Sequence, residues 1–167
     1  MISNIFLISR SILFWINIVF SVLIFGPVTF LLGIISYDLC LYFSKQWCRY
    51  NLLFLKYVCL LSYNFDNQEI KTAKMIISRH QSTWETFFFT AYIDYPIFIL
   101  KKELLMIPLF GWCLYLLKHI SIDRSDGVSS LKKIMKSCDE HIKENRTIII
   151  FPEGTRSLYG TKAKLKR

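Results

Sequence analysis

The sequence predicts an α/β fold in which hydrophobic N-terminal helices precede a mixed, largely parallel sheet flanked by helices. Three observations support this prediction. Residues 11–37 contain no charged side chain. From about residue 72 onward, short apolar runs alternate with helical patterns, which is typical of a parallel sheet with helical crossovers. Polar motifs follow directly after two of the apolar runs, where parallel sheets carry their sites.

The uncharged N-terminal segment is long enough to cross a bilayer as a helix, because about 20 residues span the hydrocarbon core. It lacks the small-residue cleavage site that ends a secretory signal peptide, so we expect the membrane to retain it. Gly26 and Pro27 interrupt it near its middle, and a kink is expected there because proline removes a helical donor. The sequence leaves open whether the segment crosses the bilayer or enters one leaflet and turns back.

A second helix is predicted over residues 39–62, where aromatic and leucine side chains mix with Lys45, Arg49 and Lys56. Tryptophan and tyrosine favour the membrane interface, so this helix is expected there; the alternative is a core helix of the soluble domain. Only Arg10 precedes the apolar segment, so the positive-inside rule places the rest of the chain in the cytoplasm. We therefore expect membrane helices in residues 1–64 at the inner membrane and a cytoplasm-facing α/β domain in residues 65–167.

The hydrophobic content, the net charge and the cysteines limit the kinds of partner and site that the protein can have. Hydrophobic residues make up 53% of the chain, and the formal net charge is +9. Such a charge suits nucleic acid, anionic lipid or phosphorylated substrates; the membrane segment favours the latter two, and no nucleic-acid partner is expected. The five cysteines show neither CxxC pairing nor zinc-ligand spacing, which predicts reduced core thiols and no metal site.

The remaining elements follow from local patterns. Short apolar, β-branched runs predict strands at residues 75–77, 97–100, 120–122 and 147–151. Helices are predicted at residues 83–92 and, with Ser125 or Asp126 as cap, at residues 127–144. His119 and His141 have no acidic partner at a useful spacing, so both are interpreted as structural or surface residues.

The first polar motif, residues 80–85, reads HQSTWE and follows the first strand. Residues five apart on a straight helix lie about 140° from each other, so His80 and Glu85 meet only if His80 precedes the helix. Glu85 then accepts a hydrogen bond from one imidazole nitrogen while the other takes a proton. Ser82 and Thr83 are expected to cap the helix. The G-x-S-x-G motif of a serine nucleophile does not occur, so we expect a hydroxyl of the substrate to be the nucleophile.

The second polar motif, residues 151–157, reads FPEGTRS at the end of the last strand. Gly154 lets backbone N–H groups approach a ligand, and Arg156 can bind a phosphate bidentately; the alternative is a turn with a surface arginine. Residues 102–112, KELLMIPLFGW, are apolar enough to form a wall against an acyl chain. Arg124 follows a strand and is a second candidate phosphate ligand, or a partner of Asp123.

These motifs resemble the ordered blocks of the 1-acyl-sn-glycerol-3-phosphate acyltransferases, a family of glycerolipid acyltransferases. HQSTWE is similar to the HxxxxD block, with Glu85 in place of the usual aspartate; residues 102–112 and 122–124 look like the second block, and FPEGTRS the third. The resemblance implies a fold of that family. It also implies acyl transfer, without a cofactor, from acyl-CoA or acyl carrier protein to the free hydroxyl of lysophosphatidic acid in the membrane, giving phosphatidic acid.

The same resemblance assigns His80 as the general base and Glu85 as the group that orients it. The substrate-binding residues that it implies, for the acceptor phosphate and the glycerol, are Lys102, Arg124, Glu153, Gly154, Thr155 and Arg156. Family members continue through a fourth block, so the domain is expected to be C-terminally incomplete. Two alternatives stay open: a related acyltransferase acting on glycerol 3-phosphate or another lysophospholipid, and an inactive membrane-anchored fragment that binds anionic lipid.

Overall fold

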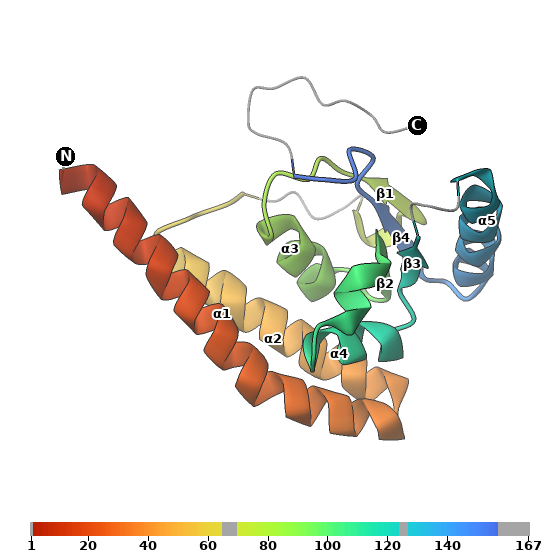
Figure 1. Cartoon of the computed structure of the whole chain (residues 1–167), viewed down its shortest axis with the longest axis horizontal. Coiled ribbons are helices and arrows are strands. Elements are labelled where there is room, and N and C mark those ends of the chain that lie inside the picture. Colours follow the sequence, from red (N-terminus) through yellow and green to blue (C-terminus); the bar gives the residue numbers. More distant parts are fainter. Residues whose placement is uncertain (1, 65–69, 124–126, 157–167) are drawn as a thin grey trace.

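A computed structural model describes residues 2–64, 70–123 and 127–156, and Figure 1 shows its arrangement. The described elements are, in order, α1 (Ile2–Ile35), α2 (Tyr37–Tyr57), η1 (Ile70–Thr72), β1 (Met75–Ile77), α3 (Trp84–Tyr92), β2 (Pro96–Lys101), η2 (Lys102–Met106), α4 (Phe110–Leu116), β3 (Ile120–Ile122), α5 (Gly127–Lys143) and β4 (Thr147–Ile150). The predicted strands and helices are present, although α2 ends at Tyr57, before the predicted residue 62. The sequence patterns missed α4 and the two short 3-10 helices.

The four described strands pair in the order β1-β4-β2-β3, and every pair is parallel. The predicted sheet was mixed but largely parallel; its described part is parallel throughout. The central strands carry β-branched runs because both faces are covered, and Ile97, Ile148 and Ile149 are fully buried. Parallel pairing places the carboxyl ends of all four strands at one edge of the sheet, beyond which the two polar motifs lie.

The core lies in layers on either side of the sheet. On one face, Phe88, Phe89 and Ile93 from α3 and its end pack against β2 and β4. On the other face, Cys138 of α5 packs against Ile97 and its neighbours in the sheet. The far side of α3 is covered by α2. The α1–α2 hairpin therefore lies outside α3, and α5 closes the opposite face, as Figure 1 shows.

A seam of polar bonds joins the two helices of the hairpin. Asn17 of α1 donates to the Asn51 side chain of α2 at 2.9 Å, and the Tyr50 hydroxyl donates to Asn17 at 2.6 Å. The Trp47 indole donates to the Ser21 hydroxyl at 2.9 Å. Buried polar groups require such partners, so these residues fix how α1 sits on α2.

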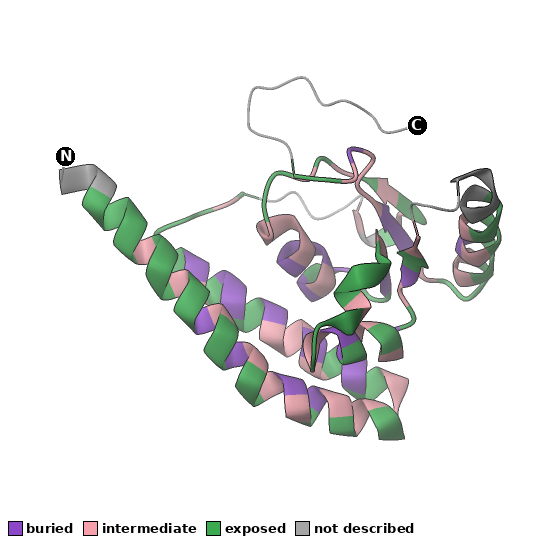
Figure 2. Cartoon of the chain, viewed as in Figure 1, coloured by how far each residue is buried: buried purple, intermediate pink, exposed green. Residues whose placement is uncertain are grey.

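The outer face of α1 is apolar and exposed. Residues 5–35 are long and apolar enough to cross a membrane by length and composition. Figure 2 shows exposed residues along the outer side of the helix, with the buried ones facing α2. The helix continues through Pro27 without a break. Figure 1 shows it bending beyond its middle, and proline is a common cause of such a bend.

Candidate active site

The two polar motifs meet at the carboxyl edge of the sheet. β1 and β4 are neighbours, and the Ser78 N–H donates to the Ile150 carbonyl at 3.0 Å, which extends their pairing past β1. The segments after both strands therefore leave the sheet side by side. His80 lies in one and Glu153 in the other, so residues 73 apart in the sequence come into contact.

His80 stands in the turn between β1 and α3, with Glu85 in the first helical turn, the arrangement that their spacing required. The distance from His80 Nδ1 to Glu85 Oε2 is 3.6 Å, slightly longer than a hydrogen bond, as is common before a substrate is bound. The imidazole stacks on the Phe151 ring with centroids 4.4 Å apart. Its Nδ1 edge faces Glu85, so Nε2 is the nitrogen turned away from the carboxylate, and the side chain remains 18% exposed.

Glu85 also closes the start of α3. Its carboxylate accepts hydrogen bonds from the N–H groups of Gln81 and Ser82, while the Ser82 hydroxyl accepts from the N–H of Trp84. This is a capping box, in which a serine and a glutamate three residues later satisfy the first N–H groups of a helix. The predicted capping role of Ser82 is confirmed; Thr83 makes no side-chain cap bond.

The same contacts keep Glu85 ionised. Burial is the largest influence and favours the neutral acid. The nearby His80 ring and the hydrogen bonds from the backbone of residues 81, 82 and 85 together outweigh burial, so the pKa of Glu85 lies below its ordinary value. A charged carboxylate beside Nδ1 orients the imidazole and stabilises its protonated form.

Glu153 is buried beneath the His80 turn, with 3% of its side chain exposed. Its Oε2 accepts from the backbone N–H of His80 at 2.8 Å, and its Oε1 accepts from the Arg79 guanidinium at 3.4 Å. The carboxylate is thus engaged with protein groups on both oxygens. This geometry fits a residue that positions the base, whereas the family resemblance implies a contact with the glycerol.

Gly154 and Arg156 complete the second motif. Gly154 has φ 62°, a left-handed conformation that glycine adopts without strain, and its N–H donates to the Phe151 carbonyl. Arg156 is exposed and donates from Nη2 to the Thr83 hydroxyl at 2.9 Å, which links the second motif to the first. A guanidinium carries five N–H donors, so this bond is compatible with phosphate binding beside the base. Thr155 is exposed on the same turn.

Lys102 follows β2 at the same edge of the sheet. Its ammonium lies 3.8 Å from the Asp123 carboxylate, and two thirds of the side chain is exposed. Two strand spacings separate β2 from β1, roughly 10 Å, so the flexible lysine stem can extend toward the His80 side. Arg124, with the predicted cap residues Ser125 and Asp126, lies outside the described residues.

The other titratable side chains singled out by the sequence are structural. His119 Nδ1 accepts from the Phe98 N–H at 3.3 Å, and removal of its ring from water lowers its pKa to about 3, so it is neutral at physiological pH. Burial, followed by the charge of Arg146, also lowers the pKa of His141. All five cysteines are free thiols. Four are buried, which confirms their interpretation as core residues, whereas Cys59 is only partly buried.

Three contributors to the site were not assigned by sequence reasoning: Arg79, which binds Glu153; Phe151, which supports the imidazole; and the capping box itself. The capping box had a visible signal, because serine at 82 and glutamate at 85 form the S-x-x-E pattern. Arg79 and Phe151 had none, since their roles depend on two distant segments leaving the sheet together.

Comparisons with known proteins agree with this fold. The family model described as Acyltransferase matches residues 62–167. Over 162 residues the chain is 38% identical to a 1-acyl-sn-glycerol-3-phosphate acyltransferase of Pseudomonas aeruginosa, covering 95% of this chain and 63% of the relative. Over 93 residues it is 43% identical to the Helicobacter pylori protein of that name, covering 54% of this chain and 38% of the relative. The chain therefore spans less than two thirds of the length of these relatives.

The fold also matches a solved structure. The crystal structure of the 1-acyl-sn-glycerophosphate acyltransferase PlsC from Thermotoga maritima aligns with a TM-score of 0.68, covering 92% of this chain and 63% of that one. At 19% identity this likeness shows the fold alone. Because the family model spans well over half of the sequence, including both polar motifs, the chain belongs to the acyltransferase family.

Proposed function

We propose that this protein transfers a fatty acyl group from acyl-CoA or acyl carrier protein to the free hydroxyl of 1-acyl-glycerol 3-phosphate, giving phosphatidic acid for phospholipid biosynthesis. The observation that carries the proposal is the His80–Glu85 pair at the carboxyl edge of the sheet, beside the exposed Arg156. The names of the bacterial relatives support the same acceptor.

His80 Nε2 takes the proton of the acceptor hydroxyl as its oxygen attacks the thioester carbonyl. The tetrahedral intermediate collapses, the C–S bond breaks, and the imidazolium returns the proton to the departing thiolate. The products are an ester and a free thiol, and the protein ends in its starting state. Glu85 stabilises the imidazolium throughout. A thioester is already activated, so the donor is a co-substrate and the proposal includes no resident cofactor.

Arg156 binds the acceptor phosphate in this proposal, with Lys102 approaching from β2 and Arg124 as a further candidate. Arginine matches phosphate oxygens with parallel N–H donors. The bond from Arg156 to Thr83 holds the guanidinium within the loop that carries the base. The phosphate-binding arginine is thereby held close to the histidine that takes the proton.

The structure of the hairpin supports attachment to one leaflet. α1 has 34 residues and is about 51 Å long at 1.5 Å per residue, whereas the hydrocarbon core is about 30 Å thick. Its inner face is joined to α2, which carries Lys45 and Arg49. We therefore propose that α1 lies with its exposed apolar face in the cytoplasmic leaflet, and that the catalytic domain faces the cytoplasm.

The test is acyl transfer by membranes that contain the protein. Membranes receive lysophosphatidic acid with labelled acyl-CoA or acyl carrier protein, and the labelled phosphatidic acid is quantified. Replacing His80 with alanine should lower the rate by about 10²–10⁴-fold, the usual contribution of a general base. His141→Asn on α5 is the matched control and should retain activity. Wild-type product at the His80→Ala level with both donors would refute the proposed activity.

A further inference from the structure

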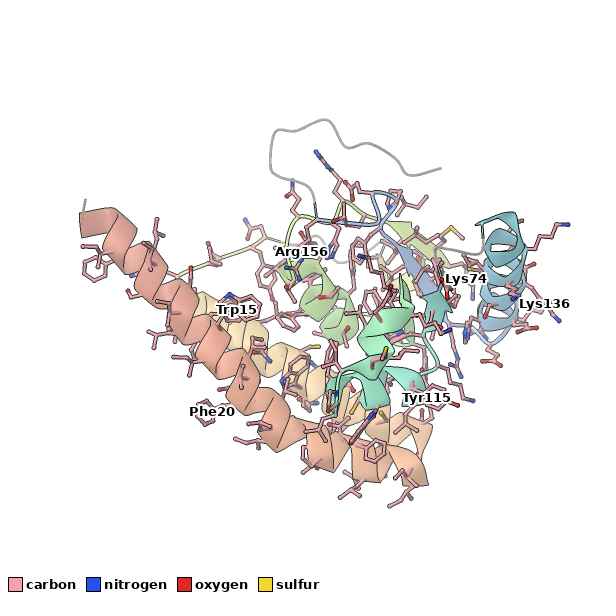
Figure 3. All side chains as sticks on the ribbon, viewed as in Figure 1. Trp15, Phe20, Lys74, Tyr115, Lys136 and Arg156 are labelled. Carbon is pink, nitrogen blue, oxygen red and sulfur yellow. The ribbon has the colours of Figure 1, made fainter. Side chains whose placement is uncertain are left out.

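A second set of exposed apolar side chains lies in the chain segment that connects β2 to β3. It is formed by η2, α4 and the turn between them, and we name it the η2–α4 face. Met106 is 80% exposed and Tyr115 is 72% exposed; Figure 2 shows η2 as an exposed element, and Figure 3 labels Tyr115. Its exposed large apolar side chains are Leu104, Met106, Ile107, Trp112 and Tyr115. A contiguous apolar patch on a surface marks an interaction site.

The η2–α4 face is continuous with the apolar face of α1. Phe30 of α1 contacts the Trp112 ring with centroids 5.3 Å apart. Glycines allow the close approach, since a Cβ on Gly26 would lie 3.0 Å from the Leu109 Cβ, and one on Gly33 would lie 2.8 Å from Leu116. The two elements therefore form one apolar surface. A groove of about 320 Å³ runs along their junction, lined by Phe30, Leu105, Trp112 and Tyr115.

A strained turn holds this face outward. Leu109 has φ 62° and ψ −58°, and the Phe110 N–H donates to the Pro108 carbonyl at 2.7 Å. These values describe a γ-turn with positive φ, which is rare and unfavourable for leucine. Such strain persists only where the surroundings impose it, and here the Leu109 side chain is packed onto Gly26 of α1. The hairpin thus fixes the conformation of the turn that follows Met106 and Ile107.

Lysines flank the η2–α4 face along the chain. Lys101 precedes η2, Lys102 begins it and Lys118 follows α4, and all three are exposed, as is the single acidic residue of η2, Glu103. An apolar surface with a lysine rim matches a leaflet that contains anionic lipid, because the ammonium groups lie at the headgroups while the apolar side chains enter the acyl region.

We propose that the η2–α4 face is a second membrane-contacting surface, which enters the same leaflet as α1 and fixes the rotation of the catalytic domain on the bilayer. The inference rests on the proposed membrane attachment of α1. A single helix lets the domain roll about the helix axis, whereas two adjoining contacts do not. The occupant is the lipid bilayer itself.

The test places an environment-sensitive fluorophore at single cysteines. The background carries Cys59→Ser, because the other four native cysteines are buried. Labels are introduced by Met106→Cys on the η2–α4 face, Leu23→Cys on the exposed side of α1, and Met135→Cys on α5. Met135 is the matched control, since it is an exposed methionine (61%) away from the proposed surface. The protein is reconstituted with vesicles of phosphatidylcholine and phosphatidylglycerol whose acyl chains carry bromine, a quencher.

We expect bromine to quench the labels at 106 and 23 to a similar degree and to leave the label at 135 unchanged. Quenching at 23 alone would overturn this inference while leaving the attachment of α1 intact. No quenching at either position would remove the membrane attachment on which the inference rests. A label at 106 that is shielded even in detergent, and insensitive to bromine, would show that protein covers this face, which also overturns it.

A second measurement uses the same pair of methionines. Met106→Ser should lower the partition of the protein into the anionic vesicles by roughly tenfold, the effect of losing one buried apolar side chain. Met135→Ser should leave the partition unchanged. Equal partition of wild type and Met106→Ser would contradict a contact at this face.

Discussion

Glu153 offers a sharp test of how the base is positioned. Its carboxylate accepts from the His80 N–H at 2.8 Å and from Arg79 at 3.4 Å, beneath the turn that carries the imidazole. Glu153→Gln retains one carbonyl oxygen for His80 but loses the charge that faces Arg79. Glu153→Ala removes both acceptors and leaves the partly buried N–H of His80 without this partner.

The expected magnitudes follow from these contacts. A hydrogen bond that involves a charged group contributes about 1.5–3 kcal/mol, so Glu153→Gln should lower the free energy of unfolding by about 1–2 kcal/mol. A shift of the base by about 1 Å can reduce the rate about 100-fold. We expect kcat to fall about 100-fold in Glu153→Ala and about tenfold in Glu153→Gln, with the KM for lysophosphatidic acid changed by less than about twofold because no acceptor contact is lost.

The assay is steady-state acyl transfer over a range of acceptor concentrations, together with thermal unfolding in detergent. Glu140→Gln on α5, where the glutamate is exposed, is the control and should match the wild type. Partial recovery of kcat in Glu153→Gln relative to Glu153→Ala distinguishes positioning from a general loss of folding. A large rise in the KM for the acceptor at unchanged kcat would refute the reasoning and restore the direct glycerol contact implied by the family resemblance.

Two further predictions concern the other charged groups of the site. The pKa of Glu85 is lowered in the folded protein, so the ionised carboxylate stabilises the fold above the unfolded pKa, and this stabilisation is lost as the pH falls through the folded pKa. The thermal unfolding temperatures of wild type and Glu85→Gln should therefore differ at neutral pH and converge in acid. A constant difference at all pH values would contradict this prediction. Arg156→Ala should raise the KM for lysophosphatidic acid by about tenfold or more, the cost of a lost charge-assisted contact, and equal use of a dephosphorylated acceptor by the wild type would contradict the assignment.

The sequence predicted the elements that depend on local patterns. Short β-branched runs gave β1 to β4, and the five-residue spacing of His80 and Glu85 placed the former in a turn and the latter at the start of a helix. The parallel direction also followed, because helices alternate with strands. The position of β4 between β1 and β2 could not be predicted, since strand order depends on packing between distant segments.

The orientation of Glu153 shows the limit of motif reasoning. The letters FPEG place a carboxylate next to a turn, but they do not indicate whether it points toward a ligand or toward the protein. Its direction is decided by the neighbouring strand, which brings Arg79 and the His80 N–H beneath it. The sequence predicted an apolar wall at residues 102–112 but not its helices or its turn, because the strained turn at Leu109 depends on the α1 residue Gly26.

Because Glu85 both caps α3 and orients His80, the catalytic pair can form only while the first turn of α3 is folded. The carboxylate that bonds to the N–H groups of residues 81 and 82 is also the partner of the His80 ring. Helix ends open at lower free energy than the core that β4 and α3 form together. On warming, fraying of this turn would separate His80 from Glu85 while the sheet is still intact. Heat inactivation should therefore be an early, reversible event that precedes global unfolding.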